Sequence, residues 1–252
     1  MENKEIKSPS PVTGHSSLLL EIGTEEIPAR FLPPALTMLR DNASSIFSEH
    51  SIDHPDIRTY ATPRRLALIV KGMPPVQKDM VKEVTGPPKK AAFDENGKPT
   101  KAAIGFAGSQ GIDVSQLSIK KTDKGEYIAA VIRQKGIPVK ELLPEVLSRI
   151  ILSLHFPKSM RWGSGNLRFV RPIHWILALY GEETIHFDID GIKSGNITKG
   201  HRFLSPGSFS VKEVPTYVHL LENNYVIADQ DKRKKLIVDG LDSISSSING
   251  VA

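Results

Sequence analysis

Hydrophobic residues recur along the chain at two spacings, and these spacings predict a mixture of strands and helices. Short apolar runs bounded by glycine, proline or polar turns predict strands at residues 17–22, 57–62, 66–71, 117–121, 126–134, 173–180, 184–189 and 225–228. Apolar positions three and four residues apart predict helices at residues 31–48, 100–108, 139–154 and 214–223, and a last helix that begins after Asp229. Strands and helices in this mixed order predict an α+β fold with mixed sheets and packed helices.

Breaks in this pattern divide the chain into three expected parts. Residues 1–16 are polar, lack the apolar core of a signal peptide and are expected to be a disordered tail. Met73-Pro74-Pro75 interrupts the pattern and predicts a boundary after a small strand–helix–strand–strand subdomain at residues 17–75. Residues 76–252 are expected to form a larger α+β subdomain.

The composition is that of an ordinary globular chain, with 39% hydrophobic and 24% charged residues. The absence of cysteine excludes disulfides and thiolate metal ligands, and it predicts a reducing, cytoplasmic location. No apolar run approaches the roughly 18 residues that span a bilayer. The formal charge of +5 favours polyanionic partners.

The stretch from residue 154 to residue 175 combines positive charge, aromatic rings and glycine without any acidic residue. Its four cations and two tryptophans are Lys158, Arg161, Trp162, Arg168, Arg171 and Trp175. Arginine binds phosphate oxygens in bidentate pairs, and tryptophan offers a face on which a base can stack. Trp175 lies within an apolar strand and is assigned to the core, whereas Trp162 fits the core or the surface. The stretch predicts a nucleic-acid surface, with cations that surround buried tryptophans as the structural alternative.

Other basic segments are candidates for the same surface. Arg64 and Arg65 either contact phosphate or pair with a local acid. His201 and Arg202 lie on a glycine-led loop. The basic run Lys232–Lys235 either binds RNA or forms the solvated face of an amphipathic helix, and the second interpretation is favoured. The candidate nucleic-acid contacts are therefore Lys158, Arg161, Trp162, Arg171, His201, Arg202, Arg64 and Arg65.

The sequence contains no motif for nucleotide hydrolysis or metal catalysis. Gly163-Ser164-Gly165 begins like a dinucleotide fingerprint, but Arg168 stands where the third glycine belongs. There is no Walker lysine loop, no His-Glu-x-x-His and no nucleophile elbow. His50 and His54 have the spacing of a helical metal pair, although Pro55 favours a helix end instead. We therefore expect no catalytic residue, no metal ligand and no bound cofactor in this segment.

Three glutamates near the first strand raise the alternative of acid–base chemistry. Glu21, Glu25 and Glu26 are close enough in sequence to act as paired carboxylates. A solvated loop is favoured instead, or a position for Glu25 and Glu26 beside the positive end of the following helix.

Eight motifs occur in order along nearly the whole chain after the tail. They are Leu19–Pro28, Thr62–Leu68, Gly86-Pro87, Gly97–Ala103, Thr122–Glu126, Lys158–Gly163, Phe169–Trp175 and Gly200–Phe203. In type, order and spacing this set resembles the β subunit of bacterial tetrameric glycyl-tRNA synthetase. Any single motif is modestly specific, whereas the ordered set is highly specific.

The resemblance implies a function and a set of partners. The family enzyme contains two α and two β chains, and it couples glycine to tRNA(Gly) while ATP is converted to AMP and diphosphate. The adenylate site, with ATP and Mg²⁺ as substrate, is implied for the α chain, and tRNA handling for the β chain. Family β chains are much longer, so this chain is expected to be an N-terminal portion that is inactive alone, with a last helix leading into further domains.

Three hypotheses follow for this segment. The first is that it contributes tRNA binding and subunit assembly to glycine–tRNA ligase. The second is a non-catalytic scaffold that docks the α subunit without touching tRNA, because tryptophan and arginine are also common at protein interfaces. The third is a hydrolase that acts on mischarged tRNA, which requires a positioned base or metal that the sequence does not show.

Overall fold

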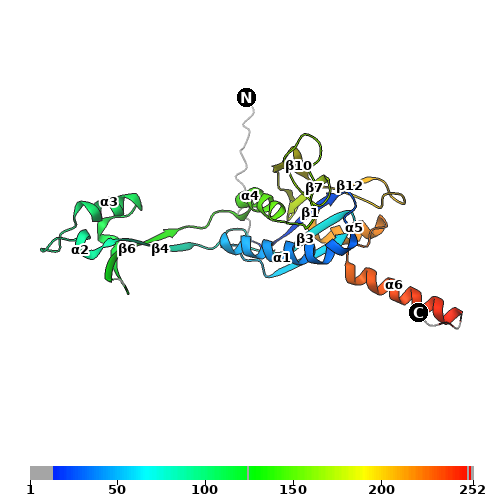
Figure 1. The fold of residues 1–252 in the computed structure, drawn as a ribbon, viewed down its shortest axis with the longest axis horizontal. Coiled ribbons are helices and arrows are strands. Elements are labelled where there is room, and N and C mark those ends of the chain that lie inside the picture. Colours follow the sequence, from blue (N-terminus) through cyan, green and yellow to red (C-terminus); the bar gives the residue numbers. More distant parts are fainter. Residues whose placement is uncertain (1–13, 124, 249, 251–252) are drawn as a thin grey trace, which may run out of the picture. The chain divides into compact units, whose positions relative to one another are not determined.

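The computed structural model describes residues 14–123, 125–248 and 250, and it confirms the expected α+β class (Figure 1). The chain forms two compact units. Unit 1 consists of the described residues up to Val76 together with those from Pro138 onward, and unit 2 is Gln77–Ile137. Val76 and Pro138 pair in an isolated antiparallel bridge, so the chain leaves unit 1 and returns to it at neighbouring positions.

The two units differ from the division expected from the sequence. The boundary expected after residue 75 coincides closely with the edge of unit 2, but residues 76–252 are shared between both units. The reason is tertiary, because β7 (Ile173–Tyr180) pairs along β1 (Ser16–Thr24) and completes the sheet that the first part of the chain begins. Of the tail expected at residues 1–16, residues 1–13 lie outside the described residues.

Unit 1 is built on a sheet in which the described residues form seven strands, in the order β2-β3-β1-β7-β10-β9, with β8 paired to β7. The remaining strands of this sheet are β2 (Asp56–Thr62), β3 (Arg65–Met73), β8 (Glu183–Thr184), β9 (Asp188–Ile189) and β10 (Ile192–Gly195). β1 is antiparallel to both of its neighbours, β3 and β7, whereas β10 runs parallel to β7. A separate two-stranded sheet contains β11 (Ile197–Lys199) and β12 (Ser208–Ser210).

Both faces of the central strands are buried. The helices of unit 1 are η1 (Ala29–Phe31), α1 (Leu32–Glu49), α4 (Val139–Leu152), η3 (Val214–Thr216), α5 (Tyr217–Asn223) and α6 (Gln230–Ser247). Leu18 and Leu20 of β1 pack on one face with the apolar sides of α1 and α4. Leu19 points to the opposite face, where η3 and α5 cover it. This double coverage explains why β1, β3 and β7 are nearly continuous apolar runs.

Local sequence sets where the helices begin. Pro33 and Pro34 fall in the first turn of α1, where a backbone N–H has no acceptor within the helix. Asp229 caps α6 as expected, because its side chain accepts hydrogen bonds from two backbone N–H groups of the first turn. All of α6 is described, and none of its residues is buried. Among the described residues, every helix is too short or too polar to cross a membrane.

Unit 2 has its own three-stranded antiparallel sheet in the order β4-β6-β5. Its elements are β4 (Met80–Pro88), α2 (Lys89–Ala92), α3 (Lys101–Ser109), η2 (Val114–Gln116), β5 (Leu117–Thr122) and β6 (Gly125–Gln134). Its core is small, and consists of the buried Ala92, Ala103 and Ile128 with Phe93, Phe106 and Leu117 packed against them. Thr100 Oγ1 accepts a hydrogen bond from Ala102 N at 3.2 Å, which confirms the expected start of α3.

Two expected strands differ from the structure. Residues 225–228 form no strand, although Val226 and Ala228 are buried in the layer that covers the second face of the sheet. The strand expected at residues 184–189 is divided into β8 and β9, because the Ser194 hydroxyl bonds to backbone groups between them. Strands β4 and β10–β12 were not expected, since their sequences are short, polar or rich in glycine and proline.

Candidate nucleic-acid interface

The second face of the sheet carries a buried polar cluster centred on Glu21 of β1. The fully buried Glu21 carboxylate accepts hydrogen bonds from Trp175 Nε1, from the Tyr217 hydroxyl and from Thr198 Oγ1, the last at 2.8 and 2.9 Å to its two oxygens. A buried carboxylate requires such donors, because it has lost its hydrating water. The interpretation of Glu21 as a solvated loop residue is therefore wrong.

Burial in this cluster, together with the charge of Glu21, keeps Tyr217 protonated. Burial raises the pKa of the Tyr217 hydroxyl well above its ordinary value, the Glu21 charge raises it further, and Arg65 offsets part of the effect. Tyr217 therefore remains a hydrogen-bond donor at neutral pH. Arg65 of β3 is only 2% exposed and brings a compensating positive charge to the same face.

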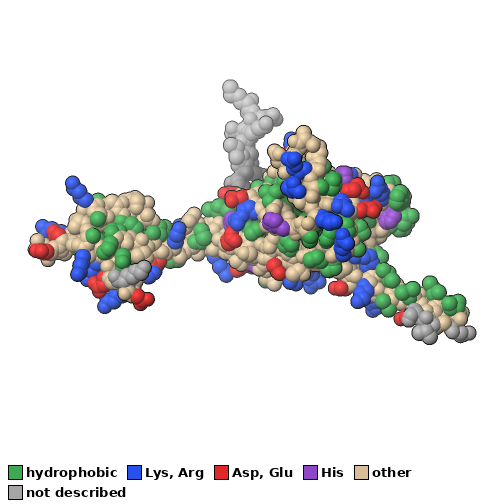
Figure 2. Space-filling view, in the orientation of Figure 1, with side chains coloured by type: hydrophobic (Ala, Val, Ile, Leu, Met, Phe, Trp, Pro, Cys, Tyr) green, Lys and Arg blue, Asp and Glu red, His purple; other side chains and the backbone are tan. Residues whose placement is uncertain are grey.

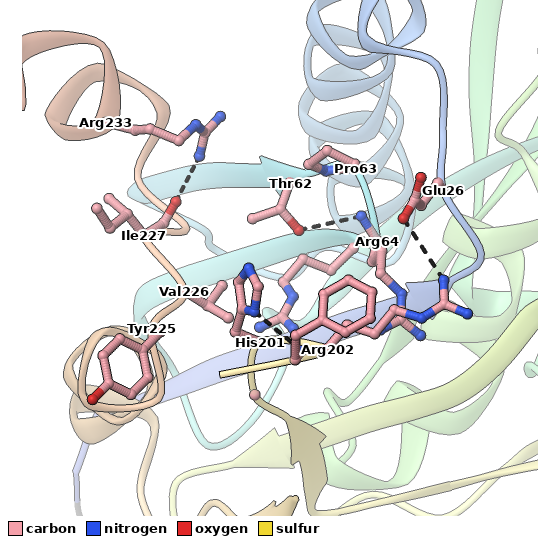
Figure 3. Close-up of a pocket in the computed structure, with 13 residues that line it drawn as sticks. Glu26, Thr62, Pro63, Arg64, His201, Arg202, Tyr225, Val226, Ile227 and Arg233 are labelled. Carbon is pink, nitrogen blue, oxygen red and sulfur yellow. Dashed lines mark hydrogen bonds and ion pairs between the residues drawn. The ribbon is translucent and has the colours of Figure 1, made fainter. Parts of the chain in front are cut away.

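Arg65 also lines a pocket of about 290 Å³ (Figure 3). Five parts of unit 1 build it: the loop after β1, the β2–β3 turn, a turn after β11, the segment after α5 and the first turn of α6. The lining residues are Glu26, Thr62, Pro63, Arg64, Arg65, Gly200, His201, Arg202, Phe203, Tyr225, Val226, Ile227 and Arg233. Four arginines and one glutamate are among them, so the lining has a net positive charge.

The β2–β3 turn brings Arg64 and Arg65 to the pocket. The turn is fixed to the end of β1, because Thr24 N donates a hydrogen bond to Arg64 O at 2.9 Å. Arg65 Nη2 donates to Lys199 O at 2.6 Å. Nε of Arg64, and Nε and Nη1 of Arg65, are buried without a hydrogen-bond partner among the described residues. Both guanidinium groups therefore retain donors that no acceptor in the described chain uses.

A second turn brings His201, Arg202 and Phe203 to the same pocket. Gly200 begins this turn, and a Cβ atom there would lie 2.4 Å from Ser205 O, so only glycine fits. His201 Nδ1 accepts a hydrogen bond from Phe203 N at 3.2 Å. One ring nitrogen of His201 is thereby used to hold the turn.

Arg202 is oriented by the two glutamates that follow β1. Its Nη1 atom lies 3.7 Å from Glu26 Oε1 (Figure 3). The same atom lies 3.2 Å from Glu25 Oε1. His174 Nε2 lies 3.2 Å from the other oxygen of Glu25, and Arg171 Nε donates to Glu26 O at 3.1 Å. Exposed pairs of this kind contribute little to stability, so an incoming anion can compete for Arg202. The fold thus places Arg202 beside both glutamate carboxylates and Arg171 beside the backbone of Glu26.

The electrostatic surroundings keep Glu25 ionised. Burial acts to raise the pKa of its carboxyl, but the hydrogen bond with His174 and the charges of Arg202 and Arg64 outweigh it, and the pKa is lowered. The interpretation that Glu25 and Glu26 serve the start of the following helix is wrong, because neither η1 nor α1 has an acidic residue in its first turn.

Two exposed aromatic rings belong to the pocket. Phe203 is 81% exposed, and Tyr225 is 62% exposed. Tyr225 has a φ angle of 60°, a conformation unusual for a residue with a side chain, and its N–H donates to Glu222 O at 3.0 Å. Arg233 donates to Ile227 O at 2.6 Å at the opposite wall (Figure 3). Arginines beside exposed rings suit phosphate binding and base stacking.

Four candidates from the basic, aromatic stretch are not among the pocket-lining residues: Lys158, Arg161, Trp162 and Arg171. Lys158 and Arg161 are exposed, and neither has a hydrogen bond or ion pair with another described residue. Trp162 is half-buried and packs against the core under α1 and α4. Met160 and Phe169 pair through hydrogen bonds of 2.8 and 3.1 Å, which close the loop that carries these residues. Contact between this loop and RNA stays a prediction.

The structure also bears on His54 and Trp175. His54 lies after the end of α1, as the expected helix end requires, and its Nε2 atom lies 2.9 Å from Ser44 Oγ. In the part of the chain that the structure describes, no group of three or more His, Cys, Asp or Glu side chains is placed to hold a metal ion. Trp175 is buried as expected, at 8% exposure.

Among the lining residues that were not candidates, three have aromatic or cationic side chains: Phe203, Tyr225 and Arg233. Phe203 directly follows the candidates His201 and Arg202 in the sequence, and this position was the one indication that it belongs to the site. Tyr225 was assigned to a strand and Arg233 to a solvated helix face, and nothing in their local sequence indicates that they approach the β2–β3 turn. Only the packing of α5 and α6 against the sheet brings them there.

The sequence matches proteins of one class, the subunits of aminoacyl-tRNA synthetases. A family model described as glycyl-tRNA synthetase beta subunit matches residues 18–252, and the chain therefore belongs to that family. The resemblance of the eight ordered motifs is thereby confirmed.

Curated relatives carry the same name, glycine–tRNA ligase beta subunit. The protein of Thermodesulfovibrio yellowstonii is 47% identical over 233 residues, which are 92% of this chain and 34% of the relative. The proteins of Moorella thermoacetica and Clostridioides difficile are 45% and 44% identical over the same shares of each chain. The chain thus spans about a third of the length of the relatives it matches.

Proposed function

We propose that this chain is the tRNA-binding and subunit-assembling part of a glycine–tRNA ligase beta subunit. It acts in an α₂β₂ complex in the cytoplasm, where ATP and Mg²⁺ are used at an adenylate site on the α subunit. The chain supplies no catalytic group to the reaction. Its role is to hold tRNA(Gly) while the partner subunit transfers glycine.

The observation that carries this proposal is the arginine-lined pocket in a member of a tRNA synthetase family. Arg64, Arg65, Arg202 and Arg233 line it against a single acidic residue, Glu26. Cations on phosphates supply most of the affinity of proteins for nucleic acid. The exposed Lys158 and Arg161 are the second candidate contact, on the loop closed by the Met160–Phe169 bridge.

The test is the salt dependence of tRNA(Gly) binding by the 252-residue chain. Arg64→Ala with Arg202→Ala removes two candidate phosphate contacts, so affinity should fall and the slope of log K against log salt should decrease by about 2. A matched control, Arg40→Ala with Arg58→Ala, removes the same charge from exposed residues outside the pocket. Unchanged affinity and slope in the pocket variant would refute the assignment.

A parallel variant decides whether the second candidate loop takes part. Lys158→Ala with Arg161→Ala removes two exposed cations that have no hydrogen bond or ion pair with another described residue, so the fold is expected to be unaffected. A weaker affinity with a shallower salt slope would add this loop to the tRNA surface. Binding equal to that of the wild-type chain would restrict the contact to the pocket.

The alternative, a scaffold that docks the α subunit without touching tRNA, is favoured by α6. Hydrophobic side chains lie exposed along this helix (Figure 2). Four of them recur at spacings of four, three and four residues and form one stripe, called here the α6 stripe: Ile237, Leu241, Ile244 and Ile248. Exposed apolar stripes of this kind commonly mark protein contacts.

Copurification with the α subunit in the absence of tRNA tests the alternative. Leu241→Lys with Ile244→Lys should abolish copurification if the α6 stripe is the contact, whereas Leu152→Lys, at an exposed position on α4, should not. Copurification that survives the stripe substitutions would exclude this surface. Retention of α by a chain that has no affinity for tRNA(Gly) would favour the scaffold over the main proposal.

A further inference from the structure

We infer that the pocket binds one unpaired nucleotide of an RNA, with its base stacked on Phe203 and its phosphate held by Arg64 and Arg202. This inference rests on the proposed function and narrows it from tRNA in general to a single-stranded nucleotide. It concerns the pocket alone, and the loop that carries Lys158 and Arg161 is not part of the proposed nucleotide site.

The size of the pocket favours one nucleotide over a duplex. Its volume of about 290 Å³ lies at the lower end of the range for small-molecule sites. A paired RNA helix presents its phosphates on a broad outer surface and keeps its bases stacked inside, so its bases cannot enter such a pocket. An unpaired nucleotide exposes both its base face and its phosphate to the same small site.

The rings of the pocket are placed for stacking and not for the core. Phe203 has the highest exposure of any large hydrophobic side chain in the described part of the chain, at 81%. It lies on a turn held by the His201 contact and by the close approach of Gly200 to Ser205, so its backbone position is defined. An aromatic ring that stays exposed to water adds no hydrophobic stabilisation to the folded chain. A base stacked on Phe203 would remove the ring from water.

The charges of the pocket are placed for a phosphate beside that ring. In the described chain, Nε of Arg64 is buried without an acceptor, and the side chain of Arg202 pairs with oxygens of the partly exposed Glu25 and Glu26. A phosphate can replace Glu26 and Glu25 as the acceptor for Arg202, because guanidinium groups bind phosphate oxygens in bidentate geometry. Arg65 is buried, and two of its donors have no partner among the residues that the structure describes, so it adds positive potential to the pocket.

The experiment compares two RNA hairpins with the 252-residue chain. One hairpin is blunt, and the other carries four unpaired nucleotides with 2-aminopurine as the last base. We expect the extended hairpin to bind about 5- to 150-fold more tightly, the effect of stacking one base, and its 2-aminopurine fluorescence to be quenched on binding. Free AMP should compete only at far higher concentration, because it lacks the remaining phosphates.

Phe203→Ala should abolish both the preference and the quenching, and Phe203→Trp should retain them. Leu204→Ala is the matched control, because Leu204 is the next residue, is 64% exposed and does not line the pocket. Since Phe203 is exposed, its replacement leaves the fold intact.

The outcomes separate this inference from the proposed function. Equal binding of the two hairpins, or a Phe203→Ala chain that still prefers the extension, would overturn the nucleotide site while tRNA binding stands. Competition by AMP as effective as by the extended hairpin would make the ligand a free nucleotide and overturn the RNA assignment. Failure to bind either hairpin or tRNA(Gly) would overturn both proposals.

Discussion

Gly23 shows how a single missing side chain organises the second face of the sheet. In the strand register Gly23 lies between Arg65 of β3 and Trp175 of β7. Side chains directly opposite each other on neighbouring strands are in contact, so a glycine between them leaves room for both. The Trp175 indole uses this room to donate to Glu21, and Lys199 Nζ lies 5.1 Å from the centre of the same ring.

Gly23→Ala should destabilise unit 1 by about 1–3 kcal/mol, the usual cost of forcing atoms into a packed site. The added Cβ atom would lie 1.9 Å from the indole of Trp175, which must then move away from Glu21. Urea unfolding measures the change. Gly195→Ala in β10 is the matched control, because no atom lies within 4 Å of its added Cβ, and it should change stability by about 0.5 kcal/mol or less. Equal effects in the two variants would contradict the argument.

The lowered pKa of Glu25 predicts a pH dependence of stability. A carboxyl group whose pKa is lower in the folded state stabilises the protein above the unfolded value of 4.5, and this contribution is lost as the pH falls through the lower folded pKa. Glu25→Gln should therefore lower the thermal midpoint slightly at pH 7, and the difference from wild type should shrink below pH 4.5. In an Arg202→Ala background the difference at pH 7 should be smaller, since one source of the shift is gone. A difference that is constant from pH 7 to pH 3 would exclude this account.

At the scale of elements, α4 and α6 are two amphipathic helices with opposite surroundings. Leu143 and Leu147 of α4 are fully buried against the sheet and α1. The α6 stripe has the same kind of spacing, but its side chains are 51–71% exposed. Because helices of this length draw most of their stability from packing, α6 has far less to hold it than α4.

Substitutions in the two helices should therefore differ in their effect on stability. Leu143→Ala should cost about 2–5 kcal/mol through the lost burial and the cavity it leaves. Leu241→Ala in α6 should change the unfolding of unit 1 by about 0.5 kcal/mol or less. Denaturant unfolding of the two variants gives the comparison. A large loss from Leu241→Ala would show that the α6 stripe is buried in solution, against a second copy or another surface.

At the scale of the whole molecule, the division into two units follows from one insertion. The chain leaves unit 1 after Val76 and re-enters it at Pro138, where Val139 N donates to Pro75 O at 2.9 Å. Unit 2 closes its own small core, with its own sheet and helices. Each unit therefore has a hydrophobic core of its own.

Removal of Gln77–Ile137, with a short Gly-Ser linker between Val76 and Pro138, should leave unit 1 folded. The linker has only a short distance to span, so its closure costs little entropy. The shortened chain still contains all the residues that line the pocket. We expect it to unfold in one cooperative thermal transition, measured by circular dichroism. A matched removal of residues 183–195, which takes β8–β10 from the main sheet, should abolish that transition. Loss of the transition in both variants would show that unit 2 is required for the fold of unit 1.

The sequence by itself determined the elements whose signals are local. The apolar pattern placed β1, α1, α4 and β7 close to their observed bounds, and Thr100 and Asp229 marked two helix starts through their capping side chains. The ordered motifs determined the family. Periodicity and capping depend on neighbouring residues along one element, so they can be seen without knowledge of what packs against it.

Only the tertiary structure decided the burial of Glu21, the discontinuous unit 1 and the composition of the pocket. Glu21 is an acidic residue in a short apolar strand, and its local sequence does not show whether the carboxylate is buried, because its donors lie on β7, β11 and α5. The candidates Arg64 and Arg202 were visible as cations, but Tyr225 and Arg233 join them only through the packing of distant segments. Burial and charge pairing depend on which segments meet in space, and a pattern along one segment does not contain that information.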